Sequence, residues 1–263
     1  MEHPINRAAA LWIAVLHVGA LAALFFISWS HIILAVAVYT VAGSLGIGVG
    51  YHRLLTHRGF KTYPWVEYTL TVCASLALQG AALSWVAAHR IHHRYSDEPK
   101  LDPHTPKDGR WWSHMDWILH PDPETFDKAY REKWVRDLLR RAFFRYQNRF
   151  WWLPMVTLGI ICLFVGGIPT VLWGVAVPVV ATWHSTWLVN SATHMWGSRR
   201  FETKDESRNN WWVALLTFGE GWHNNHHWSP TRARHGFKWY EIDVNWYVIK
   251  FLQSVGLAWE VKS

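Results

Sequence analysis

Hydrophobic and charged residues occupy separate long blocks of this chain. Residues 8–52 contain no Asp, Glu, Lys or Arg, and a helix needs about 20 apolar residues to cross a bilayer. This block predicts two transmembrane helices, at about 9–28 and 32–51. A second uncharged block, 151–198, predicts two more at about 152–167 and 170–189, separated by Gly and Pro turn residues. The pattern favours an all-α integral membrane protein with four transmembrane helices in two hairpins.

Basic residues flank the outer ends of both blocks and are missing from both hairpin turns. Because cytoplasmic loops carry an excess of Lys and Arg, we expect a multi-pass protein with both termini cytoplasmic. Residues 52–150 and 190–263 would form a helical cytoplasmic cap, within a single domain covering 1–263. In the cap, the uncharged run 68–88 is expected to lie on or dip into the membrane face, and 238–257 to form an amphipathic surface helix.

Three counts narrow the class of protein. The chain has 21 Trp among 263 residues, and Trp concentrates where a membrane meets water. The net charge of +7 is compatible with nucleic acid, anionic lipid or an acidic ligand. Because the apolar blocks are long, we expect membrane lipids and an anionic head group as partners, and no nucleic acid. The 17 histidines indicate metal chemistry through their spacing.

Three histidine clusters lie beside the apolar blocks, one HxxxxH pair and two HxxHH motifs. Their members are His52 and His57, then His89, His92 and His93, then His223, His226 and His227. Side chains at i, i+3 and i+4 share a helix face, so each HxxHH motif directs three imidazoles the same way. An ideal helix leaves the members of the HxxxxH pair roughly 140° apart. That pair would therefore bind two different metals or flank one cavity.

The number of histidines points to more than one metal. Imidazole binds Fe, Zn, Cu and Ni, and eight histidines are twice what one tetrahedral zinc needs. His184, an ionisable group inside an expected span, is a further functional candidate, whereas His104, His114 and His235 are expected on the surface or in loops. A metal transporter is an alternative, but transport needs polar groups along a path through the spans. These clusters lie at span ends.

The sequences around the clusters resemble those of membrane fatty acid desaturases, in particular the delta-9, stearoyl-CoA-desaturase-like branch. They are GYHRLLTHRGF from Gly50, HRIHHRYSD from His89 with LDPH from Leu101, and GEGWHNNHH from Gly219. The resemblance implies two non-haem irons, dioxygen, and a cis double bond placed in a long-chain acyl-CoA or acyl-lipid. It includes no fused cytochrome b5, so the electrons would come from a separate ferredoxin, rubredoxin or cytochrome b5 type donor with its reductase.

The resemblance also assigns residues that spacing alone does not select. His194, in the segment NSATH, matches a ninth metal ligand, and Asn190 in the same segment would contact the metal through water. Carboxylates commonly orient metal-bound imidazoles. Glu220, inside the third motif, is the first choice for this role, ahead of Asp97 and Asp102.

Substrate contacts are likewise implied by the resemblance. Gln79 and Trp85 would shape the bend of an acyl tunnel. A lipid or alkane hydroxylase would use a similar site, but the first and third motifs resemble those of desaturases. Zinc has a higher affinity than iron for such donors and could replace iron in purified protein.

Basic residues are the candidates for binding the head group of the substrate. They are Arg232, Arg234 and Lys238, with Arg140, Arg141 and Arg145 as others.

Overall fold

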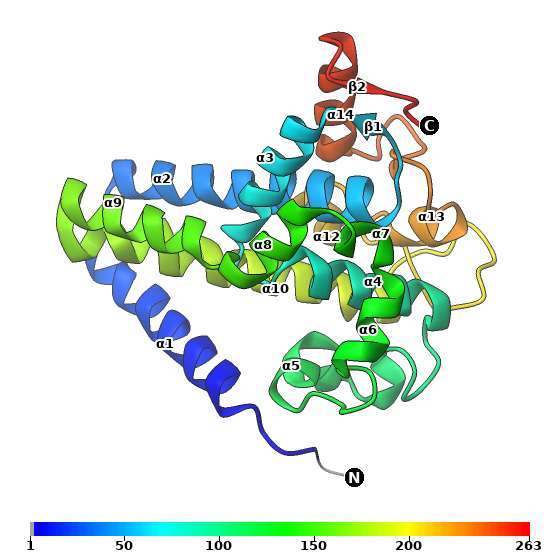
Figure 1. Ribbon diagram of the computed structural model, residues 1–263, viewed down its shortest axis with the longest axis horizontal. Coiled ribbons are helices and arrows are strands. Elements are labelled where there is room, and N and C mark those ends of the chain that lie inside the picture. Colours follow the sequence, from blue (N-terminus) through cyan, green and yellow to red (C-terminus); the bar gives the residue numbers. More distant parts are fainter. Residues whose placement is uncertain (1–2) are drawn as a thin grey trace.

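The computed structural model describes residues 3–263, and the chain begins with two long apolar helices (Figure 1). Each starts at a polar cap, Asn6 or Ser28, whose side chain accepts a backbone N–H of the first turn, as helix starts require. Arg7–Phe26 and Trp29–Thr56 are both long and apolar enough to cross a membrane. The elements are α1 (Arg7–Ala23), the 3-10 turn η1 (Leu24–Phe26), α2 (Trp29–Thr40) and the π-helix η2 (Val41–Thr56).

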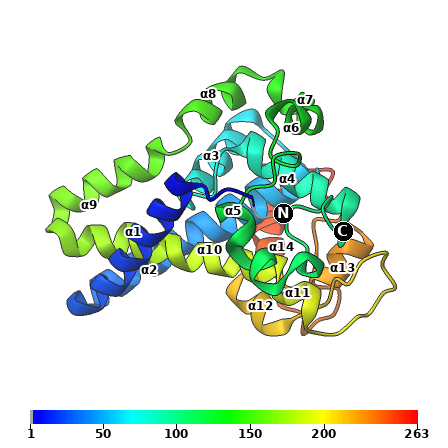
Figure 2. The ribbon, with the colours of Figure 1, turned by 90° about the horizontal axis from the view of Figure 1, so that it is seen from below.

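A third apolar stretch, Leu153–Met195, is also long enough to cross a membrane. Its regular backbone is interrupted at Gly166 and Gly167, where Gly167 has φ +70°, a conformation that favours glycine. A Cβ on Gly159 would lie 3.6 Å from Val175, so the chain folds back on itself around these two glycines (Figure 2). The elements are α9 (Leu153–Val171), η5 (Leu172–Ala176), α10 (Val177–Asn190) and α11 (Ala192–Met195).

These apolar helices form an arm that projects from the rest of the molecule (Figure 1). Large apolar side chains cover its outside: Val18 and Leu21 are 65% exposed, and Phe164 is 85% exposed. A contiguous apolar surface of this kind is a site for lipid or for another apolar partner. The arm is therefore the part of the fold suited to a bilayer.

The remaining elements form a cap of shorter helices at the other end of the arm (Figure 1). The run expected as one helix over 68–88 is broken into two, because residues 76–81 form turns that include Gly80 at φ +96°. The expected helix over 238–257 is shorter, since it starts at the Asp243 cap. The helices are α3 (Pro64–Ser75), α4 (Ala82–Tyr95), η3 (Pro106–Asp108), η4 (Trp112–Asp116), α5 (Trp117–Leu119), α6 (Lys128–Trp134), α7 (Arg136–Leu139), α8 (Ala142–Phe150), α12 (Trp211–Leu216), α13 (His223–Trp228) and α14 (Val244–Ser254). Strands β1 (Lys61–Thr62) and β2 (Ala258–Trp259) pair antiparallel.

Close packing of η2 on α3 joins the arm to the cap. A Cβ on Gly46 would come within 2.4 Å of the Ala74 backbone, so only glycine permits this approach. Tyr51, further along η2, is fully buried, and its hydroxyl accepts a hydrogen bond from Gln147 Nε2 on α8 at 3.0 Å. This packing fixes the end of η2, which carries the first histidine cluster.

Candidate metal centre

Nine histidines converge where η2 and α11 meet α4 and α13, and they are the nine selected from the sequence. They form two groups, and within each group the nitrogen atoms able to bind metal lie within 4.8 Å of one another. The five-histidine group is His52, His57, His89, His93 and His226, and the four-histidine group is His92, His194, His223 and His227.

Each HxxHH motif is divided between the two groups. On α4 the i, i+4 pair His89 and His93 belongs to the five-histidine group, while His92 belongs to the other. On α13 the i, i+4 pair belongs to the four-histidine group, and His226 crosses to His93, with 3.0 Å between their Nε2 atoms. Residues four apart are stacked one turn above each other, so each helix supplies a pair to one group and a single imidazole to the other.

The HxxxxH pair lies together in one group because the helix is not an α-helix there. The His57 amide donates to the His52 carbonyl at 3.1 Å, which is the i to i+5 bond of a π-helix. The two rings lie 4.8 Å apart between centroids. The roughly 140° separation assumed from an ideal α-helix is therefore wrong, and the pair does not serve two different groups.

Four carboxylates hold the outer nitrogen, Nδ1, of four of these histidines. Three of the acids, Glu220, Asp97 and Asp102, were selected from the sequence. Asp205 was not, because it lies in a loop outside every motif. The Nδ1-to-oxygen distances are 2.6 Å for His52 to Glu220, 2.9 Å for His92 to Asp102, 2.9 Å for His194 to Asp97 and 2.8 Å for His227 to Asp205.

These carboxylates are ionised at neutral pH. Burial alone would raise the pKa of Asp97, but the hydrogen bond and charge of His194 lower it to about 2. His92 and His227 likewise outweigh burial and hold the pKa of Asp102 and of Asp205 far below the usual range. An ionised carboxylate accepts the Nδ1–H of the imidazole, which leaves the Nε2 lone pair directed into the group.

The donor atoms of both groups fit a bound metal ion. Burial lowers the pKa of His89, His93, His223 and His226 well below the usual value, so these rings are neutral, as metal ligands must be. The buried Nε2 atoms of His57 and His227 have no hydrogen-bond partner among the described residues. Neutral imidazoles with convergent lone pairs are a donor set for Fe, Zn or Cu.

A buried charge network ties the five-histidine group to the C-terminal part of the chain. Arg53 is fully buried and contacts Glu220 and Asp243 at 3.0 and 2.8 Å. Burial raises the pKa of Glu220, but Arg53 and His52 together bring it well below the usual range. His235 lies in a loop, as expected, and it is buried there: it is 1% exposed, with its Nδ1 3.1 Å from Glu220.

Three other histidines lie outside the nine. His104 lies in a loop, as expected, but it is buried, with its ring 4.4 Å from that of His92, because the loop after α4 folds under the four-histidine group. His184 belongs to neither group: its ring nitrogens lie 3.0 Å from His17 and 3.1 Å from His114. This partly buried chain links α1, α10 and η4, so His114 is also drawn inward.

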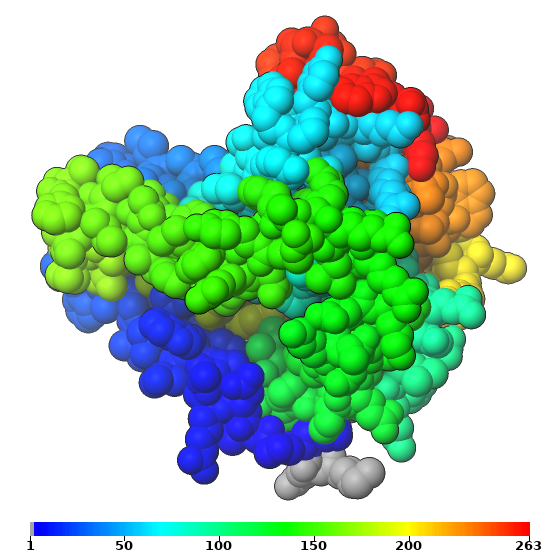
Figure 3. Space-filling view, in the orientation of Figure 1, coloured from blue at the N-terminus to red at the C-terminus, as the bar shows by residue number. Residues whose placement is uncertain are grey.

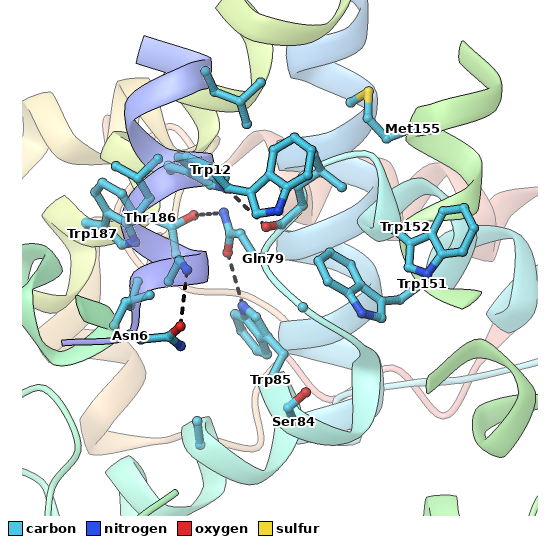
Figure 4. A pocket seen from close by; sticks show the side chains of 18 of the residues that line it. Asn6, Trp12, Gln79, Ser84, Trp85, Trp151, Trp152, Met155, Thr186 and Trp187 are labelled. Carbon is cyan, nitrogen blue, oxygen red and sulfur yellow. Dashed lines mark hydrogen bonds between the residues drawn. The ribbon is translucent and has the colours of Figure 1, made fainter. Parts of the chain in front are cut away.

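A cavity of about 860 Å³ lies beside the five-histidine group and touches His89. Its size is within the range of ligand pockets. Gln79 and Trp85 both line it, and Gln79 donates to Thr186 Oγ1 at 2.9 Å and accepts from Trp85 Nε1 at 3.1 Å (Figure 4). The Trp85 ring stacks on that of His89 with 5.1 Å between centroids. The selected tunnel residues therefore line the cavity where it meets the five-histidine group.

The other selected residues are placed as follows. Asn190 lines this cavity and a smaller one beside His52 and His89, and no hydrogen bond among residues 3–263 joins its side chain to a histidine. Arg232 lies over the rings of Trp228 and Phe237. In the described part of the chain, the large cavity is lined by none of Arg232, Arg234, Lys238, Arg140, Arg141 and Arg145.

The fold and site define a helical protein with apolar segments able to span a membrane, a histidine-rich centre suited to metal, and a large, mostly apolar cavity beside it. Residues 27–250 match the family model for fatty acid desaturases. The chain is 44% identical to the sn-2 palmitoyl-lipid 9-desaturase of Nostoc sp. (strain 36), over 96% of this chain and 89% of that protein. It is 43% identical to the sn-1 stearoyl-lipid 9-desaturase of Anabaena variabilis (98% and 94%) and 44% identical to the icosanoyl-CoA 5-desaturase of Limnanthes douglasii (99% and 73%).

The chain therefore belongs to the fatty acid desaturase family, and it is an oxidoreductase that acts on fatty acyl chains. This confirms the resemblance drawn from the three histidine motifs. It also favours desaturation over hydroxylation as the reaction.

Proposed function

We propose that this protein places a cis double bond at the delta-9 position of a long saturated acyl chain, carried by an acyl-lipid or by acyl-CoA. The observation that carries the proposal is the convergence of nine histidines beside a large, mostly apolar cavity. Relatives with 9-desaturase in their names support the position of the double bond.

Two iron ions would occupy the two histidine groups, one in each. When bound, they supply the oxidising power, with dioxygen and two external electrons, that removes two hydrogens from an unactivated chain. The four carboxylates hold the imidazoles in the tautomer that iron needs. Zinc could replace iron in purified protein. Asn190 would contact the metal site through a water molecule.

The cavity walls would position the acyl chain and exclude water. Trp85 stacks on His89, so a chain that passes Trp85 lies beside the five-histidine group. Gln79 holds Trp85 through one hydrogen bond and α10 through another, which fixes the shape of the wall at this point. An ordered wall determines which carbon pair faces the histidines, because reaction needs a positioned substrate.

The membrane arrangement that we propose has four transmembrane helices in two hairpins. The break at Gly166 and Gly167 and the contact of Gly159 with Val175 support a hairpin within the third apolar stretch. The basic flanks support a cytoplasmic location for both termini and for the histidines. The electron donor would then be a separate ferredoxin, rubredoxin or cytochrome b5 type protein on that side.

Expression in a host that lacks unsaturated fatty acids tests this function. We expect new delta-9 double bonds, located by mass spectrometry of the total lipids after chemical derivatisation. A hydroxylase would instead add one oxygen without loss of two hydrogens. Absence of both products from iron-loaded protein supplied with electrons would refute the proposal.

A further inference from the structure

Arg131, on α6, is the one Lys or Arg among the described residues that line the large cavity. Its guanidinium is held in place, because Nε donates to the Thr125 carbonyl at 2.8 Å and Cζ lies 3.9 Å from the centre of the Phe126 ring. Among residues 3–263, neither Nη atom has a hydrogen-bond partner, and Nη2 is buried while Nη1 is accessible. No ion pair within residues 3–263 includes this side chain.

The missing partner is energetically significant. Burial lowers the pKa of Arg131 only to about 10, so the group is charged at neutral pH. Burying a charged donor without an acceptor costs more free energy than burying a neutral donor without one. Guanidinium groups bind carbonyl, carboxylate and phosphate oxygens. Because Arg131 lines the cavity and Nε is already bonded, its Nη hydrogens are the donors available to an oxygen of a ligand there.

The position of Arg131 in the cavity matches the polar end of an acyl substrate. The cavity is bounded by the cap helices α5 and α6 on one side and by α9 and η5 of the apolar arm on the other. Gly159 and Val175, from the arm, offer only apolar contacts, which suit the methyl end of a chain. Trp85 and His89, on α4, also line the wall.

The side of the cavity is open between α1 and α9. Three residues line the cavity and are also exposed on the outside of the molecule: Trp12, Trp152 and Val156 are 64%, 43% and 45% exposed. The space-filling view shows a hollow between dark blue α1 and the green chain (Figure 3). In a bilayer this opening faces lipid, so an acyl chain reaches the cavity without passing through water.

We propose that Arg131 binds the ester end of a membrane glycerolipid whose acyl chain has entered the cavity from the side between α1 and α9. The proposal rests on the proposed desaturase function and names its substrate class. The ester of the bound acyl chain offers one strong acceptor, its carbonyl oxygen, to this guanidinium. An acyl-CoA carries several phosphates and needs several cations, and the described lining supplies one.

The test compares Arg131→Gln and Arg131→Met with Arg136→Gln, a control at an exposed arginine nearby on α7. Iron-loaded protein is assayed in mixed micelles with stearoyl phosphatidylglycerol, stearoyl monogalactosyldiacylglycerol and stearoyl-CoA. We expect the Arg131 variants to raise KM for both glycerolipids about tenfold, the size of one lost hydrogen bond to a charged group. The kcat, the double-bond position and the Arg136→Gln enzyme should match wild type.

A binding measurement without turnover separates the two proposals. Native mass spectrometry of detergent-purified protein should show less retained glycerolipid in both Arg131 variants, with unfolding temperatures equal to wild type or higher. If that loss is seen while wild type makes no double bond, the proposed function fails and the Arg131 assignment stands. Unchanged retention and KM would overturn the assignment. So would a loss restricted to phosphatidylglycerol, which would place Arg131 at the phosphate, and so would a preference of wild type for stearoyl-CoA.

Discussion

Replacement of Asp205 by Asn should remove metal from one histidine group and leave the other occupied. Asp205 accepts a hydrogen bond from His227 Nδ1 at 2.8 Å, and both side chains are nearly inaccessible, at 2% and 1% exposure. The amide keeps the shape of the carboxylate but loses its charge and no longer favours the tautomer with Nε2 free. Loss of such a partner weakens metal affinity about 10- to 100-fold, which corresponds to about 1.4–2.7 kcal/mol.

Metal titration measures this effect directly. Wild type, Asp205→Asn and the control Glu206→Gln are equilibrated with buffered ferrous iron, and the iron content per chain is measured. We expect two irons in wild type and in the control, whose glutamate is 46% exposed, and about one in Asp205→Asn at intermediate iron concentrations, with desaturation lost. Superimposable titrations for all three proteins would refute the role of Asp205. Loss of both irons together would show that the two groups do not bind independently.

Three further outcomes test the site and the fold. His92→Ala should abolish desaturation while the protein remains in the membrane fraction; turnover above a few per cent of wild type would remove His92 from the ligands. Gly46→Val should lower the unfolding temperature in detergent, because its Cβ would meet the Ala74 backbone at 2.4 Å and overpacking costs about 1–3 kcal/mol; an unchanged temperature would contradict the close packing of η2 on α3. Asp137→Asn should also lower the unfolding temperature at neutral pH. Burial raises the pKa of Asp137, but hydrogen bonds from Arg90 and Arg58 bring it to about 2. Its stabilisation is therefore present above the unfolded pKa of about 4 and lost as pH falls through the folded value. The difference between wild type and Asp137→Asn should shrink between about pH 4 and about pH 2, and a pH-independent difference would contradict this origin.

The chemistry of the site was predictable because it is local. Each of the two HxxHH motifs places three imidazoles on one face of its own helix, and this depends only on the local backbone. The apolar blocks were equally clear, since length and lack of charge are sufficient. His194 was found only through the family resemblance.

The remaining features depend on contacts between distant segments. Asp205 meets His227 across a loop without any marked spacing, and His235 is buried only because its loop packs against Glu220. The π-helical bond between His52 and His57 brings together two side chains that an ideal α-helix would hold apart. No residue pattern in this segment predicts that bond. Arg131 acquires significance only when the cavity and its missing acceptor are both visible.

The network around Arg53 has a consequence for the order in which the protein matures. Arg53 lies in the first quarter of the chain, but its counterions Glu220 and Asp243, and the Ala233 carbonyl that it also contacts, come from the last quarter. During synthesis the N-terminal helices are inserted long before these acids leave the ribosome. Until then the first histidine cluster has neither its neutralising carboxylates nor the imidazoles of α13. Under the proposed function, iron loading would therefore be a late, post-translational event that follows closure of the C-terminal segment over η2.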